Sequence, residues 1–146
     1  MHFVTGGAFN GKTEWVKNFY HHPGESDFDV VSACALTDPA AGLDLSQSEN
    51  LMIVGMEQWV RKELTKNHAD QVRSLFNERL ESWSQWEKEE ASRMLVIIGT
   101  DITKGIVPVD KNDRLWRDVT GWVFQDIAKR ADRVDVIWYG LNQRLK

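Results

Sequence analysis

Short apolar runs alternate along this chain with longer segments in which hydrophobic residues recur every three or four positions. The β-prone runs occupy residues 2–5, 28–33, 51–54, 94–98 and 134–139, and residues 143–146 are expected to add a short edge strand. Helical spacing is found at residues 13–20, 56–66, 68–91 and from about 113 to 127. Strands that alternate with helices are typical of an α/β fold with a mostly parallel sheet flanked by helices.

The ends of these segments carry further signals. Asp113 is the expected N-cap of the last helix. The stretch from residue 21 to 50 is rich in Gly, Pro, Ser and Asp, so we expect it to be mostly loop. Ligands of parallel α/β sheets bind beyond the carboxyl ends of the strands. The loops that follow residues 33, 54, 98 and 139 are therefore expected to meet a ligand.

A glycine-rich motif follows the first strand. Residues 6–13 read G-x-x-x-x-G-K-T, between a β-prone run and a segment with helical spacing. In this context the backbone amides and the helix dipole form a cradle for phosphate, and the lysine reaches the outer phosphates. We therefore predict a P-loop that binds ATP or GTP through Gly6, Gly7, Ala8, Phe9, Asn10, Gly11, Lys12 and Thr13. Lys12 is the expected catalytic cation, and the Thr13 hydroxyl is expected to bind Mg²⁺.

An enzyme that uses a nucleotide also needs a carboxylate near Mg²⁺ or the attacking oxygen. No strand is followed at once by an acid. Glu57 comes after the third strand and Asp101 after the fourth. We favour Asp101 as the catalytic and metal-binding carboxylate, because Glu57 falls where a helix is expected to have begun.

Two further groups of side chains leave alternatives open. Arg114 and Arg117, one helical turn apart, either clamp a phosphate or form surface ion pairs such as Asp113–Arg117, and the ion pair is the simpler reading. His21 and His22 are either nucleophiles or metal ligands, or they occupy an exposed helix end, where cationic side chains are favoured. We prefer the helix end.

Composition excludes several classes of protein. The 146 residues suffice for one domain, residues 1–146, and the net charge of −4, without any basic run, argues against a nucleic-acid partner. No apolar stretch is long enough for a membrane span, and the chain starts in a strand instead of a signal peptide. The single Cys34 suits a reducing compartment, so we expect a cytoplasmic protein.

The carboxyl-terminal third resembles a known family in several motifs at once. DITKGIVP at residues 101–108 is followed by RLWRDVTG at 114–121, ADRV at 131–134 and a terminal G-x-x-x-x-L-K, and the P-loop opens with TGGA at 5–8. These motifs resemble the adenosylcobinamide kinase/adenosylcobinamide-phosphate guanylyltransferase family of cobalamin biosynthesis. The resemblance covers about residues 1–20 and 94–146, and the chain looks like a shortened, divergent member.

The resemblance implies a P-loop fold, a homotrimer, and two reactions: phosphorylation of a corrinoid hydroxyl and then transfer of GMP through a histidine. It aligns Asp101 with a family glutamate. The family's histidine lies in an R-x-x-H-x-x-R-P segment after the second strand, whereas residues 32–50 contain neither histidine nor arginine. The family's acid at the end of the third strand falls on Val54.

We therefore expect a kinase that transfers phosphate from ATP or GTP to a corrinoid, and we do not expect guanylyl transfer. One alternative is a nucleotide-binding regulatory or assembly subunit without turnover, which the missing carboxylate and histidine would explain. Another is a kinase of a different small molecule.

Overall fold

The computed structural model describes residues 1–21, 28–33 and 48–146, and it has the expected alternation of strands and helices. The strands are β1 (His2–Thr5), β2 (Asp29–Ser32), β3 (Asn50–Val54), β4 (Met94–Ile98), β5 (Arg133–Trp138) and β6 (Leu141–Arg144). The helices are α1 (Lys12–Tyr20), α2 (Met56–Leu64), α3 (Ala69–Glu89) and α4 (Lys111–Arg130). Among the described residues, no helix is both long and apolar enough to cross a membrane.

The strands form one sheet in the order β2-β3-β4-β1-β5-β6. The first five strands along the chain run parallel, and β6 pairs with β5 in the antiparallel direction. β1 lies in the middle of the sheet, where His2 is in register with Val96 of β4 on one side and with Arg133 of β5 on the other. The predicted fold class, a P-loop-type α/β fold with a mostly parallel sheet, is confirmed.

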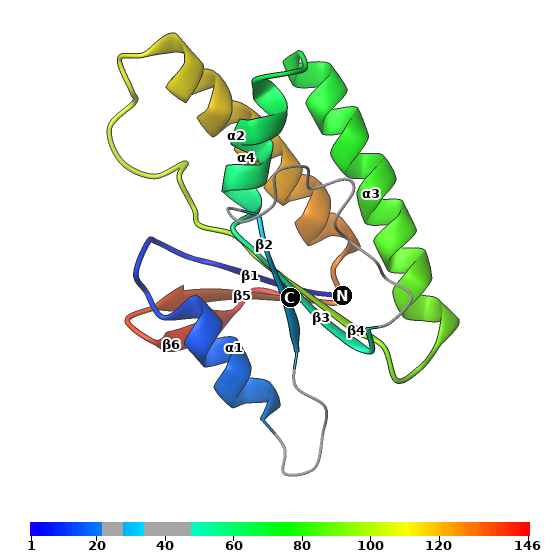
Figure 1. Ribbon diagram of the computed structural model, residues 1–146. Coiled ribbons are helices and arrows are strands. Elements are labelled where there is room, and N and C mark those ends of the chain that lie inside the picture. Colours follow the sequence, from blue (N-terminus) through cyan, green and yellow to red (C-terminus); the bar gives the residue numbers. More distant parts are fainter. Residues whose placement is uncertain (22–27, 34–47) are drawn as a thin grey trace.

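The two faces of the sheet are covered unequally (Figure 1). Helices α2, α3 and α4 pack on one face, and α1 lies on the other. Alternate strand residues point to opposite faces, so Phe3, Leu95 and Ile97 join the larger core under the three helices. Val4 and Val96 join the smaller core, which also contains Val16 of α1.

Several boundaries differ from the expectation by a few residues. The terminal edge strand is present, but it spans Leu141–Arg144 instead of residues 143–146. The expected N-cap, Asp113, is wrong: the N-cap of α4 is Asp110, three residues earlier. Its carboxylate accepts hydrogen bonds from the backbone N–H groups of Asn112 and Asp113. Asp113 instead lies in the first turn, where its carboxylate is 3.0 Å from Arg61.

Candidate functional site

The loop between β1 and α1 has three residues with a positive φ: Gly6, Phe9 (+59°) and Gly11. Gly6 has a φ of +142°, and a Cβ atom there would lie 2.3 Å from the carbonyl oxygen of Ile137 in β5. Gly11, with a φ of +79°, is the N-cap of α1. The glycines therefore let the loop fold tightly against the neighbouring strand and turn directly into the helix.

Lys12 is enclosed by this loop. Its Nζ atom donates hydrogen bonds to the carbonyl oxygens of Gly6 (3.2 Å) and Gly7 (2.7 Å), and the residue is only 9% exposed. Burial lowers the pKa of Lys12 below its usual value, and the negative charge of Glu57 opposes that shift. A positive charge is thus held at the amino-terminal end of α1, which the helix dipole also makes attractive to anions.

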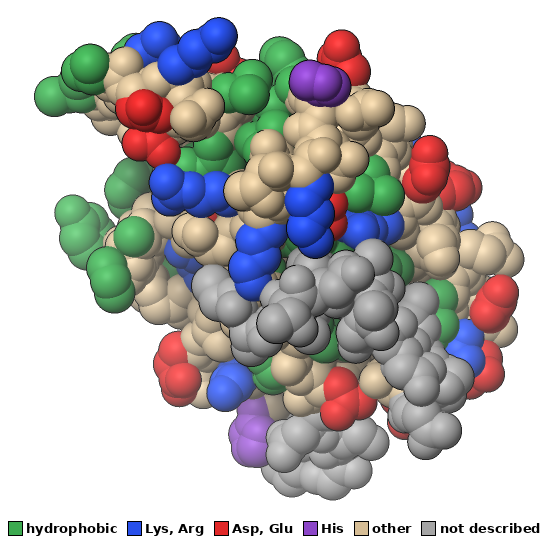
Figure 2. Space-filling model, turned by 45° about the horizontal axis from the view of Figure 1, so that its top comes forward, with side chains coloured by type: hydrophobic (Ala, Val, Ile, Leu, Met, Phe, Trp, Pro, Cys, Tyr) green, Lys and Arg blue, Asp and Glu red, His purple; other side chains and the backbone are tan. Residues whose placement is uncertain are grey.

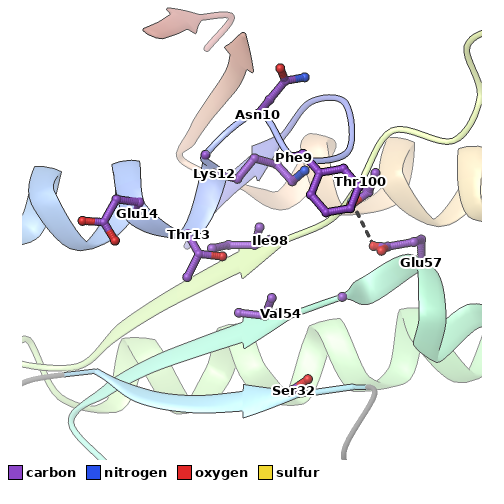
Figure 3. Close-up of a pocket in the computed structure, with 12 residues that line it drawn as sticks. Phe9, Asn10, Lys12, Thr13, Glu14, Ser32, Val54, Glu57, Ile98 and Thr100 are labelled. Atoms are coloured by element: carbon purple, nitrogen blue, oxygen red, sulfur yellow. Dashed lines mark hydrogen bonds between the residues drawn. The ribbon is translucent and has the colours of Figure 1, made fainter. Parts of the chain in front are cut away.

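A cavity of about 490 Å³ opens beside the loop, at the carboxyl ends of the strands. Residues 9–14 form one wall, and the opposite wall is formed by Ser32, Val54, Gly55, Glu57, Ile98 and Thr100. In Figure 3, Lys12 and Thr13 extend toward the cavity, whereas Asn10 points away from it. Residues that directly follow β3 and β4 thus meet at one place beside the P-loop, as expected, and Ser32 at the end of β2 joins them. The loop that follows residue 33 lies outside the described residues, and Tyr139 does not line this cavity.

On the wall opposite the P-loop the carboxylate is Glu57, not the favoured Asp101. Glu57 is 6% exposed, and its Oε2 atom accepts a hydrogen bond of 2.8 Å from the backbone N–H of Thr100, drawn as the dashed line in Figure 3. Because α2 begins directly after Gly55, its first turn stands over the carboxyl end of β3. The early helix start in the sequence, directly after Gly55, is thus the feature that brings Glu57 to the cavity.

Asp101 makes different contacts. Its backbone N–H donates to the carbonyl oxygen of Gly6 at 2.9 Å, so the residue adjoins the P-loop. Its Oδ1 atom accepts from the backbone N–H of Thr103 (2.9 Å) and from the Thr103 hydroxyl (2.6 Å), and Oδ2 lies 3.8 Å from Lys104. The side chain thus shapes its own loop and does not line the cavity.

Arg114 and Arg117 of α4 bind backbone carbonyl groups instead of forming the ion pairs that the sequence suggested. Arg114 donates to the carbonyl oxygens of Pro108 (3.1 Å) and Val109. Arg117 donates to the carbonyl oxygen of Thr103. Both side chains therefore fasten the loop that links β4 to α4, and the suggested Asp113–Arg117 pair is replaced by Asp113–Arg61.

The described histidines lie away from the cavity. His21 is the C-cap of α1, so the nine residues of the helix, at about 1.5 Å each, separate it from the P-loop. His68 caps α3, and His2 is buried in β1. His22 lies outside the described residues. The preferred reading of His21, a helix end, agrees with its position.

His2 belongs to a buried polar network on the α1 side of the sheet. Its Nε2 atom lies 2.9 Å from Asp135, and its Nδ1 atom lies 2.7 Å from the Tyr20 hydroxyl. A carboxylate only accepts hydrogen bonds, so Nε2 carries the proton, and neutral Nδ1 accepts from Tyr20. Burial lowers the pKa of His2 to about 4, although the bond and charge of Asp135 raise it. The residue is therefore neutral at pH 7.

Comparison with known proteins identifies the family. The family of cobinamide kinase/cobinamide phosphate guanyltransferase matches residues 25–145. No curated protein matches the chain. The P-loop precedes the matched residues, so the loop and the family match are separate observations that agree with the motifs in the carboxyl-terminal third. The chain therefore belongs to the cobinamide kinase/cobinamide phosphate guanyltransferase family.

Proposed function

We propose that this protein is a nucleotide-dependent kinase that phosphorylates a hydroxyl group of a cobinamide-type corrinoid. The observation that carries the proposal is the cavity into which the Lys12 ammonium, the Thr13 hydroxyl and the Glu57 carboxylate converge from two elements. Family membership supplies the class of acceptor, and the P-loop supplies the class of donor.

The roles of the loop residues follow from their chemistry. The backbone N–H groups of residues 6–12 hold the β-phosphate of ATP or GTP at the amino-terminal end of α1, where the dipole favours negative charge. Lys12 leaves its carbonyl partners to neutralise charge on the transferred phosphate.

A magnesium ion fits this set of side chains. Magnesium prefers oxygen ligands, usually one or two from the protein together with phosphate oxygens and waters. The hydroxyl of Thr13 and the carboxylate of Glu57 line the same cavity and supply such oxygens. When bound, the ion neutralises phosphate charge. We assign the direct contact with the ion to Thr13, with Asp101 as the candidate acidic ligand, and keep Glu57 for proton transfer.

The transfer itself needs a base and a charge stabiliser. The acceptor hydroxyl attacks the γ-phosphorus, its proton passes to the Glu57 carboxylate, and the bond to the leaving nucleoside diphosphate breaks. Lys12 stabilises the charge that spreads over the transferred group. Glu57 is held for this task by the backbone N–H of Thr100.

We further propose that guanylyl transfer is absent. That reaction needs an imidazole near the α-phosphate and cations beside it. Residues 32–50 contain neither histidine nor arginine, and no histidine in the described part of the chain lines the cavity.

Incubation with Mg²⁺, labelled ATP or GTP and adenosylcobinamide tests the proposal. We expect a phosphorylated corrinoid, no GMP-linked product, and no acid-labile mass increase of one GMP on the protein after incubation with GTP. Lys12→Met keeps the aliphatic stem and removes the charge, so it should weaken nucleotide binding about 30-fold or more and leave the circular dichroism spectrum unchanged.

Other outcomes of these assays would contradict the proposed kinase activity or its site. Equal nucleotide affinity in the wild type and Lys12→Met contradicts the P-loop site. Binding without turnover favours the regulatory or assembly subunit, and turnover with another acceptor favours a kinase of a different small molecule. A GMP adduct that a His21/His22 double substitution removes contradicts the absence of guanylyl transfer.

A further inference from the structure

The β5–β6 hairpin places an exposed aromatic residue next to the P-loop. Trp138 of β5 pairs with Leu141 of β6, so Tyr139 and Gly140 form a two-residue turn. Their φ angles are +50° and +77°. Positive φ at both positions is the geometry of the tight hairpin turns that prefer Asn-Gly or Gly-Gly.

Tyrosine is an uncommon choice at the first position of such a turn. A side chain with a Cβ atom in the left-handed region carries a conformational cost that glycine avoids and asparagine reduces. Tyr139 gains no burial in return, since it is 89% exposed. Residues kept in a costly conformation without a packing role are often functional, so a ligand contact of the ring is the explanation to test.

The turn is fastened to the P-loop itself. The backbone N–H of Gly140 donates to the carbonyl oxygen of Asn10 at 3.0 Å, and the backbone N–H of Tyr139 donates to Asn10 Oδ1 at 3.3 Å. Asn10 points away from the cavity in Figure 3, in keeping with these bonds. The backbone of Tyr139 is therefore held beside the loop that would hold the phosphates, and its exposed ring extends from that point.

The order of the strands decides which part of a nucleotide would meet Tyr139. Glu57 and Thr100 follow β3 and β4, on one side of β1, whereas the hairpin lies on the other side. In the proposed reaction the γ-phosphate faces Glu57. Since the phosphates form a linear chain through the loop, the α-phosphate and the nucleoside leave on the side of the hairpin.

The neighbouring aromatic residue, Trp138, already contacts a cation within the protein. Lys104 Nζ lies 4.6 Å from the centroid of the Trp138 ring, a cation–π contact. The Trp138 and Tyr139 rings are 6.5 Å apart and tilted by 43°. Tyr139 thus presents the more exposed ring of the two, and a flat aromatic group stacks well on such a surface. Hydrophobic side chains also protrude from the left edge of the molecule in Figure 2.

We propose that Tyr139 is the stacking platform for the purine base of the bound nucleotide. The proposal rests on the proposed function, because it takes the direction of the nucleotide from the place of phosphate transfer. Stacking on one ring hardly distinguishes bases. The platform therefore serves ATP and GTP alike and adds affinity without choosing between them.

Calorimetry with Mg²⁺ and three probes tests this platform: ATP, GTP and inorganic tripolyphosphate, which lacks a base. Tyr139→Asn removes the ring and suits the left-handed backbone, so the turn should be preserved. We expect it to bind ATP and GTP roughly 5- to 100-fold more weakly, by similar factors, and tripolyphosphate unchanged. Tyr139→Phe keeps the ring and should bind all three like the wild type. Leu141→Asn changes another exposed hairpin residue and is the matched control, expected to be silent.

Four outcomes of the calorimetry would overturn the stacking role of Tyr139. Unchanged nucleotide affinity in Tyr139→Asn overturns the platform. An equal loss for nucleotides and tripolyphosphate also overturns it, because the residue then acts only by supporting Asn10 and the loop. Selective loss of nucleotide affinity in Phe9→Ala, with Tyr139→Asn silent, would place the base on the cavity side instead. If the wild type binds neither nucleotide nor tripolyphosphate, the proposed function itself fails and the platform with it.

Discussion

The charge balance of the site depends on two residues, Lys12 and Glu57. Each is almost fully buried, and the charge of Glu57 supports the charged form of Lys12. Buried charges are tolerated when a partner of opposite sign is close. In Glu57→Gln the neutral amide can still accept a hydrogen bond from Thr100, so this variant removes charge while it preserves shape.

Glu57→Gln should therefore reduce kcat about 100-fold or more, since loss of a general base typically costs two to four powers of ten. Asp101→Asn, whose side chain can still accept from Thr103, should change kcat by less than about threefold. Steady-state kinetics with ATP and adenosylcobinamide would measure both. The reverse pattern would restore Asp101 to the role first expected for it.

His2 should make stability depend on pH. Its pKa is about 4 in the folded protein and 6.5 ordinarily, so the unfolded chain binds a proton that the folded protein does not. The stability that neutral His2 contributes is complete above pH 6.5 and is lost as the pH falls toward 4. Between pH 7 and 4.5 we expect a loss of about 2–3 kcal/mol of unfolding free energy.

Urea unfolding of the wild type and His2→Gln at both pH values checks this, because glutamine has no proton to gain. The titratable and charged groups near His2 are Asp135, Tyr20, Arg133 and the amino terminus of Met1. The lowered pKa of Asp135 acts only below pH 3.8, outside this window. If the wild type and His2→Gln lost the same unfolding free energy between the two pH values, groups other than His2 would be responsible.

Among single residues, the sequence indicated the P-loop motif but favoured Asp101, whereas Glu57 is the one of the two that lines the cavity. The motif has a fixed spacing within one loop, so its geometry follows from local sequence. Whether Glu57 or Asp101 points at Lys12 depends on where a helix starts and how a loop folds back. The helix start and the path of the loop both depend on tertiary structure, so residue type alone does not reveal them. The same holds for Arg114 and Arg117, whose role in fastening a loop could not be predicted from the sequence.

At the scale of the elements, strands and helices follow the hydrophobic pattern closely. The strand at Met94–Ile98 matches its expected bounds, because a continuous β-branched run closed by glycine leaves little freedom. The first residue of a helix is harder to predict from sequence when several acidic residues lie close together, as at the beginning of α4. Asp110 and Asp113 both resemble caps, and only the backbone decides between them.

Replacement of the true cap should be the costlier change. Asp110→Ala should lower the unfolding free energy by about 1 kcal/mol, because the N–H groups of Asn112 and Asp113 lose their acceptor. In thermal unfolding this corresponds to a Tm lower by about 2–4 °C. Asp113→Ala, which breaks the exposed pair with Arg61, should cost less than about half as much. Equal effects would mean that the helix start is not held by Asp110.

At the scale of the whole molecule, the family resemblance and the seven tryptophans together predict a homotrimer. Trp59, Trp83 and Trp86 lie in the monomer core, so they are not available for subunit contacts. Trp122 and Trp138 are partly exposed and remain candidates. Light scattering at micromolar concentration should give three times the mass of the chain, and a monomer mass would contradict the prediction. The single-domain organisation and the cytoplasmic location also stay predictions.

The central position of β1 has a consequence for biosynthesis. Among the six strands of this sheet β1 is translated before the others, yet both of its neighbours, β4 and β5, come far later along the chain. Gly6 also packs against Ile137, and Asn10 is fastened to Tyr139 and Gly140. On the ribosome the P-loop therefore stays without its supports until β5 and the hairpin turn have been made. The proposed nucleotide binding cannot stabilise the nascent chain before that point. The apolar residues of β1 stay without strand partners until then, so this is the stage at which chaperone protection would matter most.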